Sequence, residues 1–201
     1  MNIDTLVVGP LEANCYIVSR NGMAFVVDPG ADAYEIKQHL VADSLKLDFI
    51  IFTHGHADHI GAALEFHAPM YILAGEEKML ADPRLNMSYF SGHEVQIDPL
   101  SVFTVKHGDE IDFEGDKLKI IHTPGHTAHG MSILYDGVVF SGDSLFKGSV
   151  GRSDLPTGNE ASLINAIRGR LFSLPDKTLV YPGHGMSTTI GHEKLNNPFF
   201  I

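Results

Sequence analysis

The stretch Thr53-His54-Gly55-His56-Ala57-Asp58-His59 decides how the rest of this chain is interpreted. Its pattern, H-x-H-x-D-H, places three imidazoles and one carboxylate within six consecutive residues. The stretch follows an apolar run, Phe49–Phe52, which is too short for a core helix and predicts a buried strand. In α/β folds, side chains at strand ends commonly build a site. A histidine-rich surface loop is the alternative, but four nitrogen and oxygen ligands at this density indicate metal binding.

Three further candidate ligands, His126, Asp143 and His184, each follow another predicted strand. Together with the first motif they make a set of seven: His54, His56, Asp58, His59, His126, Asp143 and His184. Zinc and similar metals take three or four such ligands each, so this set serves two metals if one carboxylate bridges. No thiolate is among the ligands, which favours an open site that holds water over a closed structural zinc site.

The remaining pattern predicts one α/β domain over residues 1–201. Asn21-Gly22 and Asp136-Gly137 predict tight hairpins because both positions of such turns accept positive φ. Short strands are expected at Ile3–Val8, Cys15–Ser19, Ala24–Asp28, Phe49–Phe52, Glu110–Phe113, Lys117–His122, Met131–Tyr135, Val138–Phe140 and Thr178–Tyr181. Helices are expected at Ala33–Asp43, with Ile36, Leu40 and Val41 as its apolar positions, at Ile60–His67, with Leu64 buried, and at Ser162–Leu171.

Some residues allow two interpretations. Asp28, in Asp28-Pro29-Gly30, either closes a plain turn or orients a metal-bound imidazole. Residues 82–92 have little regular period, so they form either a lid or wall beside a site or a plain surface excursion. Four other histidines are expected at a helix end, on the surface or behind the ligands, namely His67, His122, His129 and His192.

Composition narrows the class of protein. The chain has 201 residues, 44% of them hydrophobic, with 20 Gly and 10 Pro, which predicts a globular protein with a sizeable core. Its formal net charge is −11, and no cluster of Lys and Arg occurs, so nucleic acid is not an expected partner. The apolar runs are short and the start is acidic, which argues against a membrane span and a signal peptide. The single Cys15 suits a cytoplasmic setting.

The histidine-rich motif resembles the signature of the metallo-β-lactamase superfamily. Five other stretches resemble its glyoxalase II group, the hydroxyacylglutathione hydrolases: His122–Thr127, Ser141–Phe146, Gly151–Asp154, Tyr181–Gly185 and Asn196–Phe199. The resemblance covers nearly the whole chain and is greatest to the small bacterial members. It implies an αββα sandwich, that is, two mixed sheets flanked by helices, with a dinuclear site at one sheet edge.

The resemblance also assigns the ligands. His54, His56 and His126 would hold the first metal, Asp58, His59 and His184 the second, and Asp143 would bridge them. The implied cofactors are two divalent ions, zinc before iron or manganese, and the implied substrate is a small thioester such as S-lactoylglutathione. A water shared by two cations loses its proton near neutral pH, since one zinc already lowers its pKa to ~7. The hydroxide would attack the thioester carbonyl with Asp58 and Asp143 as catalytic ligands, and the thiolate needs no strong acid to leave.

Several features depart from the larger glyoxalase II enzymes. The sequence ends at Ile201 without their C-terminal helical domain, Met186 stands where they place a tyrosine, and His129 stands where a glycine is common. Arg152 matches a basic residue that helps to hold glutathione, although it could instead pair with Asp154. Glutathione recognition is therefore the least supported part of the resemblance.

Two other functions stay open. A mononuclear iron persulfide dioxygenase would use one site of two histidines and one carboxylate. The complete second ligand set, Asp58, His59 and His184, argues against it. A non-enzymatic metal-binding or partner-binding domain would not require an open, bridged site.

Overall fold

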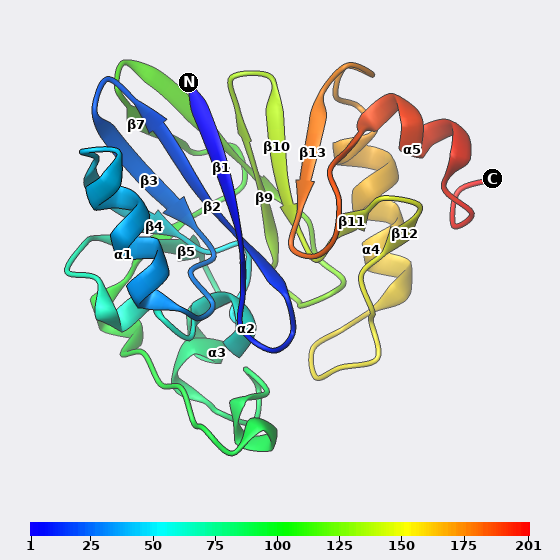
Figure 1. Cartoon of the computed structure of the whole chain (residues 1–201). Helices are drawn as coiled ribbons and strands as arrows, with labels where there is room; N and C mark the ends of the chain where they lie inside the picture. Colours follow the sequence, from blue (N-terminus) through cyan, green and yellow to red (C-terminus); the bar gives the residue numbers. More distant parts are fainter. The chain divides into compact units, whose positions relative to one another are not determined.

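The computed structural model describes all 201 residues, which form two compact units. The first unit comprises Met1–Ile72 and Glu77–Thr104, and the second comprises Leu73–Glu76 and Val105–Ile201. Each unit is built on a six-stranded mixed sheet with helices beside it (Figure 1). The predicted α/β class, with two mixed sheets flanked by helices, is confirmed.

The first sheet carries its antiparallel strands at one side and its parallel strands toward the other. β1, β2 and β3 pair antiparallel, whereas β3, β4 and β5 pair parallel. Asn21 and Gly22 have φ of 53° and 79°, as the predicted hairpin turn requires. The spatial order is β1 (Asn2–Val8), β2 (Ala13–Arg20), β3 (Met23–Val27), β4 (Lys46–Ile51), β5 (Met70–Leu73) and β6 (Phe103–Val105).

Helix α1 (Ala33–Ala42) buries Ile36 and Leu40 in the core that it shares with β2, β3 and β4. Val41, the third apolar position of the predicted helix, is instead 72% exposed. Five residues turn an α-helix by about 140° from the starting side chain, so Val41 cannot lie on the same face as Ile36. The predicted helix is correct, but its predicted apolar face was one residue too wide.

The helix predicted for Ile60–His67 is wrong in its bounds. Helix α2 (Ala57–Ile60) begins inside the histidine-rich motif and ends before Gly61, and a 3₁₀ turn follows at Ala63–Glu65. A side chain at Gly61 would lie 2.4 Å from the Gly30 carbonyl oxygen, so only glycine fits where the chain leaves α2. The 3₁₀ turn buries Ala63 and Phe66, and Leu64, predicted as buried, is 57% exposed.

The segment between Gly75 and His107, which lacks a clear period, is ordered by side-chain hydrogen bonds. It contains α3 (Glu77–Ala81) and 3₁₀ turns at Ser88–Ser91 and Pro99–Ser101. The carbonyl of the buried Asn86 accepts a hydrogen bond from the N–H of Ala57 at 2.8 Å, and its amide donates to the carbonyl of Val95 at 2.9 Å. Asn86 therefore fixes this loop to the first residue of α2.

The second sheet is antiparallel except for the pairing of β10 with β13. The predicted turn at Asp136-Gly137 is present, with φ of 45° and 82°. A separate hairpin, β11 (Leu145–Phe146) with β12 (Ser149–Val150), follows β10. The order is β14 (Thr188–Thr189), β13 (Leu179–Pro182), β10 (Val138–Gly142), β9 (Met131–Tyr135), β8 (Asp116–His122) and β7 (Glu110–Phe113).

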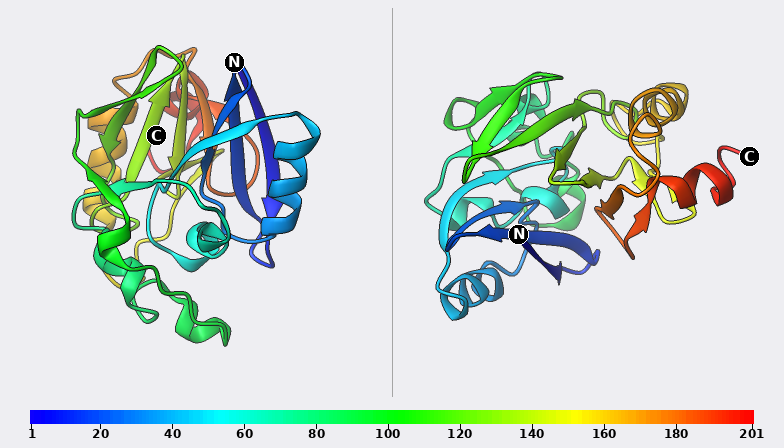
Figure 2. Two further views of the ribbon diagram at one scale, coloured as in Figure 1. Left: turned by 90° about the vertical axis from the view of Figure 1, so that its left-hand side faces the viewer. Right: turned by 90° about the horizontal axis from the view of Figure 1, so that it is seen from above.

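Helix α4 (Glu160–Ala166) runs beside the second sheet and continues as a π-helical turn, Ile167–Leu171 (Figure 2). It begins two residues before the predicted start because the Asn159 side chain accepts a hydrogen bond from the N–H of Ser162. Helix α5 (Ile190–Asn196) was not predicted from the sequence. None of the helices has the length and apolar character that a membrane crossing requires.

A buried carboxylate ties α5 to the β11–β12 hairpin. Glu193 accepts hydrogen bonds from the Thr188 hydroxyl at 2.6 Å, the Asn197 amide at 2.8 Å and the N–H of Gly148 at 2.9 Å. The Asn197 amide also donates to the carbonyl of Ser149 at 3.0 Å. Asn197, part of the C-terminal stretch that carries the family resemblance, thus holds the hairpin from which the Gly151-Arg152 segment continues.

Candidate metal centre

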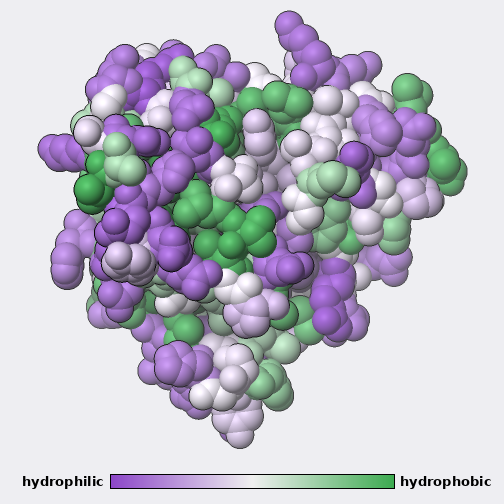
Figure 3. Space-filling view, in the orientation of Figure 1, coloured by the Kyte–Doolittle hydropathy of each residue, from purple (hydrophilic) through white to green (hydrophobic).

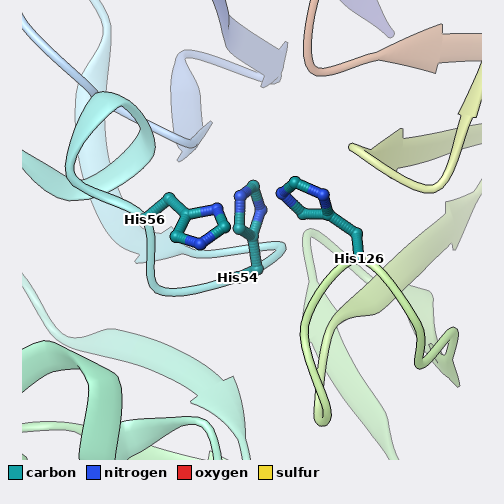
Figure 4. A group of neighbouring side chains, drawn as sticks. All are labelled: His54, His56 and His126. Atoms are coloured by element: carbon teal, nitrogen blue, oxygen red, sulfur yellow. The ribbon is translucent and has the colours of Figure 1, made fainter. Parts of the chain in front are cut away.

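Each candidate ligand follows the end of a strand, as the sequence predicts. In the first unit, His54 and His56 lie in the loop after β4, and Asp58 and His59 lie on α2. In the second unit, His126 follows β8, Asp143 follows β10 and His184 follows β13. Figure 4 shows the imidazoles of His54 and His56 on the loop after β4, and that of His126 on the loop after β8.

Three imidazoles of the first unit are buried and lie against one another. The ring centroid of His54 lies 4.8 Å from that of His56 and 4.2 Å from that of His59. Imidazole binds metals in its neutral form, and metal binding gives buried polar rings a reason to converge. The Nε2 of His59 lies 3.7 Å from Oδ2 of Asp58. Two ligand atoms of one tetrahedral zinc ion, each about 2.1 Å from it, lie roughly 3.4 Å apart, so this spacing fits a common metal.

Asp28 orients two of these imidazoles. Its carboxylate accepts hydrogen bonds from the N–H of Thr53 at 2.7 Å, from the Thr53 hydroxyl at 2.6 Å and from Nδ1 of His59 at 2.9 Å. Because the Thr53 hydroxyl donates to Asp28, its oxygen accepts from Nδ1 of His54 at 3.1 Å. Both rings therefore carry their proton on Nδ1 and present Nε2 as the ligand atom. The orienting interpretation of Asp28 is confirmed.

In the second unit, a carboxylate lies between two imidazoles. Oδ2 of Asp143 lies 3.5 Å from Nε2 of His126 and 3.7 Å from Nε2 of His184. These separations are longer than a normal hydrogen bond and close to the spacing of two ligands on one ion. Nδ1 of His126 donates to the backbone carbonyl of Arg152 at 2.7 Å, which directs Nε2 toward Asp143.

Two glycines allow the ligand loops to approach so closely. A side chain at Gly30 would lie 1.5 Å from the carbonyl oxygen of Asp58, and one at Gly151 would lie 1.7 Å from the carbonyl oxygen of Asp143. Neither space can hold a carbon atom, so only glycine fits. Gly151 thereby brings the Arg152 carbonyl into reach of His126.

The side chain of Arg152 pairs with Asp154, the alternative that the sequence left open. Its Nε and Nη2 donate to the two carboxylate oxygens of Asp154 at 2.8 and 2.9 Å. Both side chains are exposed, and the hydrogen bond from Arg152 lowers the pKa of Asp154 to about 2. The contact of Arg152 with His126 is through its backbone. Sequence reasoning missed this contact, because any residue supplies a carbonyl; the role of the side chain in substrate binding stays a prediction.

Four other histidines that the sequence places outside the metal site lie outside the groups of closely spaced ligand atoms. His122 is half-buried, its ring is stacked on that of His129 with centroids 6.1 Å apart, and burial lowers the pKa of its imidazole. The N–H of His129 donates to the buried carboxylate of Glu76 at 3.1 Å. No cluster of three or more closely spaced His, Cys, Asp or Glu side chains contains any of these four residues, which are His67, His122, His129 and His192.

The family model of the metallo-β-lactamase superfamily matches residues 8–184. The chain belongs to this superfamily. Among curated relatives in the superfamily, a probable metallo-hydrolase of Bacillus subtilis, YqgX, is 36% identical and covers 96% of this chain and 94% of its own length. The hydroxyacylglutathione hydrolase GloC of Haemophilus influenzae is 32% identical and covers 99% of this chain and 98% of its own length.

Solved structures of the superfamily share the fold. BLEG-1, a B3 metallo-β-lactamase, has a TM-score of 0.92 at 33% identity, covering 99% of both chains. TTHA1623, crystallised in a di-iron-bound form, has a TM-score of 0.87 at 32% identity, covering 98% of this chain and 99% of that one. ETHE1 from Myxococcus xanthus has a TM-score of 0.78 at 30% identity, covering 98% and 84%.

Membership of the metallo-β-lactamase superfamily accounts for the ligand chemistry of both units. The histidine and aspartate clusters are those of a metal-binding protein, and the relatives support a metal-dependent hydrolase that acts on a small molecule. The donors are nitrogen and oxygen atoms that suit zinc, iron or manganese.

Proposed function

We propose that this protein is a dinuclear metal-dependent hydrolase that cleaves thioesters, with S-lactoylglutathione and related hydroxyacyl thioesters as its substrate class. The observation that carries the proposal is the preset orientation of the imidazoles. Their Nδ1 atoms are held by Asp28, Thr53 and the Arg152 carbonyl, so that Nε2 is presented for coordination. Such orientation serves a metal centre and has no purpose in an ordinary surface loop.

The ligand loops of both units serve one metal pair in this proposal. Asp143 would be the bridging ligand, and the position of its Oδ2 near the Nε2 atoms of His126 and His184 supports this role. The family resemblance of the sequence supports the division between two ions. The first ion would be held by His54, His56 and His126, and the second by Asp58, His59 and His184. Zinc is the first expectation for both ions, with iron or manganese as alternatives.

The protein's own residues then prepare the site for hydrolysis. When bound, the two ions lower the pKa of a water molecule and polarise the substrate carbonyl. Asp28 and the Arg152 carbonyl keep the ligand rings in place, which preserves the geometry during the reaction. Water adds its oxygen to the acyl carbon, the C–S bond breaks, and the thiol leaves with a proton. Because a thiolate is a stable leaving group, no acidic side chain is needed beside the sulfur.

The similarity to GloC over the whole chain supports the thioester class. The similarity to ETHE1 keeps the alternative of a persulfide dioxygenase with one iron. The di-iron form of TTHA1623 supports instead that iron can occupy a two-ion site of this fold. The second ligand set, Asp58, His59 and His184, favours the hydrolase, since a single iron would not use it.

A substrate panel on protein of measured metal content tests the proposal. We expect about two divalent ions per chain, hydrolysis of S-lactoylglutathione, and no oxygen uptake with glutathione persulfide. Asp143→Ala should lose the second ion and at least about a hundredfold in kcat/KM while staying folded. If the protein instead holds one tightly bound iron and takes up oxygen with glutathione persulfide, it is a dioxygenase and not a hydrolase. No turnover of any thioester, lactone or phosphodiester would indicate a binding protein.

A further inference from the structure

The first unit contains a pocket of about 900 Å³ beside α2. Its walls come from the β1–β2 turn, from the start of α1, from α2 and from the loop that Asn86 anchors. A volume of this size is within the range of small-molecule sites. Its lining is mostly apolar and includes Val8, Leu11, Ala62, Met87, Phe90 and Val95. From the loop of residues 82–92, Met87, Phe90 and Ser91 line this pocket; whether the loop also covers the metal site stays a prediction.

The pocket adjoins the proposed metal ligands. Ala57 and Asp58 are part of its wall, and the side chain of Asp58 is 22% exposed. A substrate whose carbonyl lay beside Asp58 would have the pocket next to its reacting carbon. The group that enters it must therefore be attached close to that carbonyl.

The charges of the wall do not favour the glutathione half of a thioester. The lining contains no Lys or Arg and includes three carboxylates, on Asp32, Asp58 and Glu65. Glu65 is paired with Lys37 at 3.4 Å, and Asp58 is a proposed metal ligand. Glutathione carries two carboxylates, for which this lining offers no Lys or Arg partner. An uncharged, apolar group needs no such partner.

Two large apolar side chains at this pocket are exposed to water. Leu11, in the β1–β2 turn, is 64% exposed, and Phe90, in the anchored loop, is 69% exposed. Figure 3 shows hydrophobic residues grouped over the β1–β2 hairpin on a face that is otherwise largely hydrophilic. Apolar side chains that converge on one pocket indicate an apolar ligand. The lactoyl group has too few carbon atoms to cover them both.

We infer, resting on the proposed thioester hydrolysis, that this pocket binds the acyl chain of the substrate and selects apolar acyl groups larger than lactoyl. The thiol carrier lies outside the pocket. The substrate class is thus a thioester with a medium-length alkyl or an aromatic acyl group. Leu11 and Phe90 set the preference for chain length.

A series of S-acylglutathiones with acetyl, lactoyl, butyryl, hexanoyl and octanoyl groups tests this inference. Each added methylene that is buried should raise kcat/KM by up to about fourfold until the pocket is filled. Phe90→Ala should lower kcat/KM about fivefold for the octanoyl substrate and less than twofold for the acetyl substrate. Leu100→Ala, which truncates another exposed apolar residue of the same unit outside the pocket, is the matched control and should change neither.

Binding measured without turnover separates the possible failures. By calorimetry, S-octylglutathione should bind more tightly than S-methylglutathione, and Phe90→Ala should remove most of the difference. If thioesters are hydrolysed at rates independent of acyl length, or if Phe90→Ala behaves like Leu100→Ala, the pocket assignment is wrong and the thioesterase stands. If no thioester is hydrolysed, the proposed function fails first.

Discussion

His59 and His126 are oriented by different means, although each lies just beyond a strand and donates from Nδ1. His59 donates to a buried side-chain carboxylate, Asp28, at 2.9 Å, whereas His126 donates to the backbone carbonyl of Arg152 at 2.7 Å. A carboxylate adds negative charge and strengthens the imidazole as a ligand, while a carbonyl only directs it. The first support can be removed by one substitution. The second survives any change of the Arg152 side chain and depends instead on the path of the backbone.

Of the substitutions that test this comparison, removal of the Asp28 carboxylate should have the largest effect on metal affinity. Asp28→Asn keeps the size of the side chain but leaves three donor groups facing one uncharged amide. We expect about a 10- to 100-fold loss of metal affinity, measured by titration against a competing chelator. Asp48→Asn, an exposed carboxylate on β4, is the control and should bind metal normally. Normal affinity in Asp28→Asn would mean that the burial of the rings alone orients them.

The backbone support can be broken at Gly151. In Gly151→Ala the new methyl group would overlap the Asp143 carbonyl oxygen, so the hairpin must shift and the Arg152 carbonyl must move away from His126. We expect a loss of about 1–3 kcal/mol in unfolding free energy, measured by denaturant titration, together with weaker metal binding. Gly169→Ala, where nothing lies within 4 Å of the new carbon, should be neutral or slightly stabilising. Equal stability of the two variants would show that the hairpin relaxes easily.

Arg152→Ala tests whether only the backbone of Arg152 orients His126, because the substitution removes the side chain and leaves the carbonyl in place. Arg152→Ala should change metal affinity less than twofold, in contrast to Asp28→Asn. If the side chain also binds glutathione, KM for S-lactoylglutathione should rise about tenfold with kcat nearly unchanged. Steady-state kinetics with a glutathione thioester and an uncharged thioester decide this point. If KM changes equally for both substrates, the side chain of Arg152 pairs with Asp154 and does not bind glutathione.

The Arg152–Asp154 pair should give the smallest effect, and one that depends on pH. The pKa of Asp154 is lowered to about 2, chiefly by the hydrogen bond from Arg152, so the pair stabilises the fold when the carboxylate is ionised. The contribution is fully present above the ordinary pKa of about 4 and is lost as the pH falls through about 2. The urea midpoint of Asp154→Asn should therefore lie slightly below that of the parent protein at pH 6 and approach it in acid. A difference that grows in acid would contradict this sign.

Local patterns were sufficient for much of the site. The apolar run Phe49–Phe52 followed by the histidine-rich motif predicts a strand that ends at a group of ligands, and β4 ends at Ile51. The Asn21-Gly22 and Asp136-Gly137 turns need only two residues, and both are present. Such signals are read correctly because neighbouring residues determine them.

Contacts between distant residues decided the rest. Helix α2 ends at Ile60 where Gly61 packs against Gly30, and Leu64 beyond it is exposed. The loop after Ala81 is ordered because Asn86 bonds to Ala57. His126 is oriented by a carbonyl 26 residues away, and a carbonyl has no signature in the sequence. The sequence by itself therefore determined which side chains are the candidate ligands and that they lie at strand ends. Only the tertiary structure decided what orients them and which pocket adjoins them, because both depend on backbone groups that every residue carries and on packing between segments far apart in the chain.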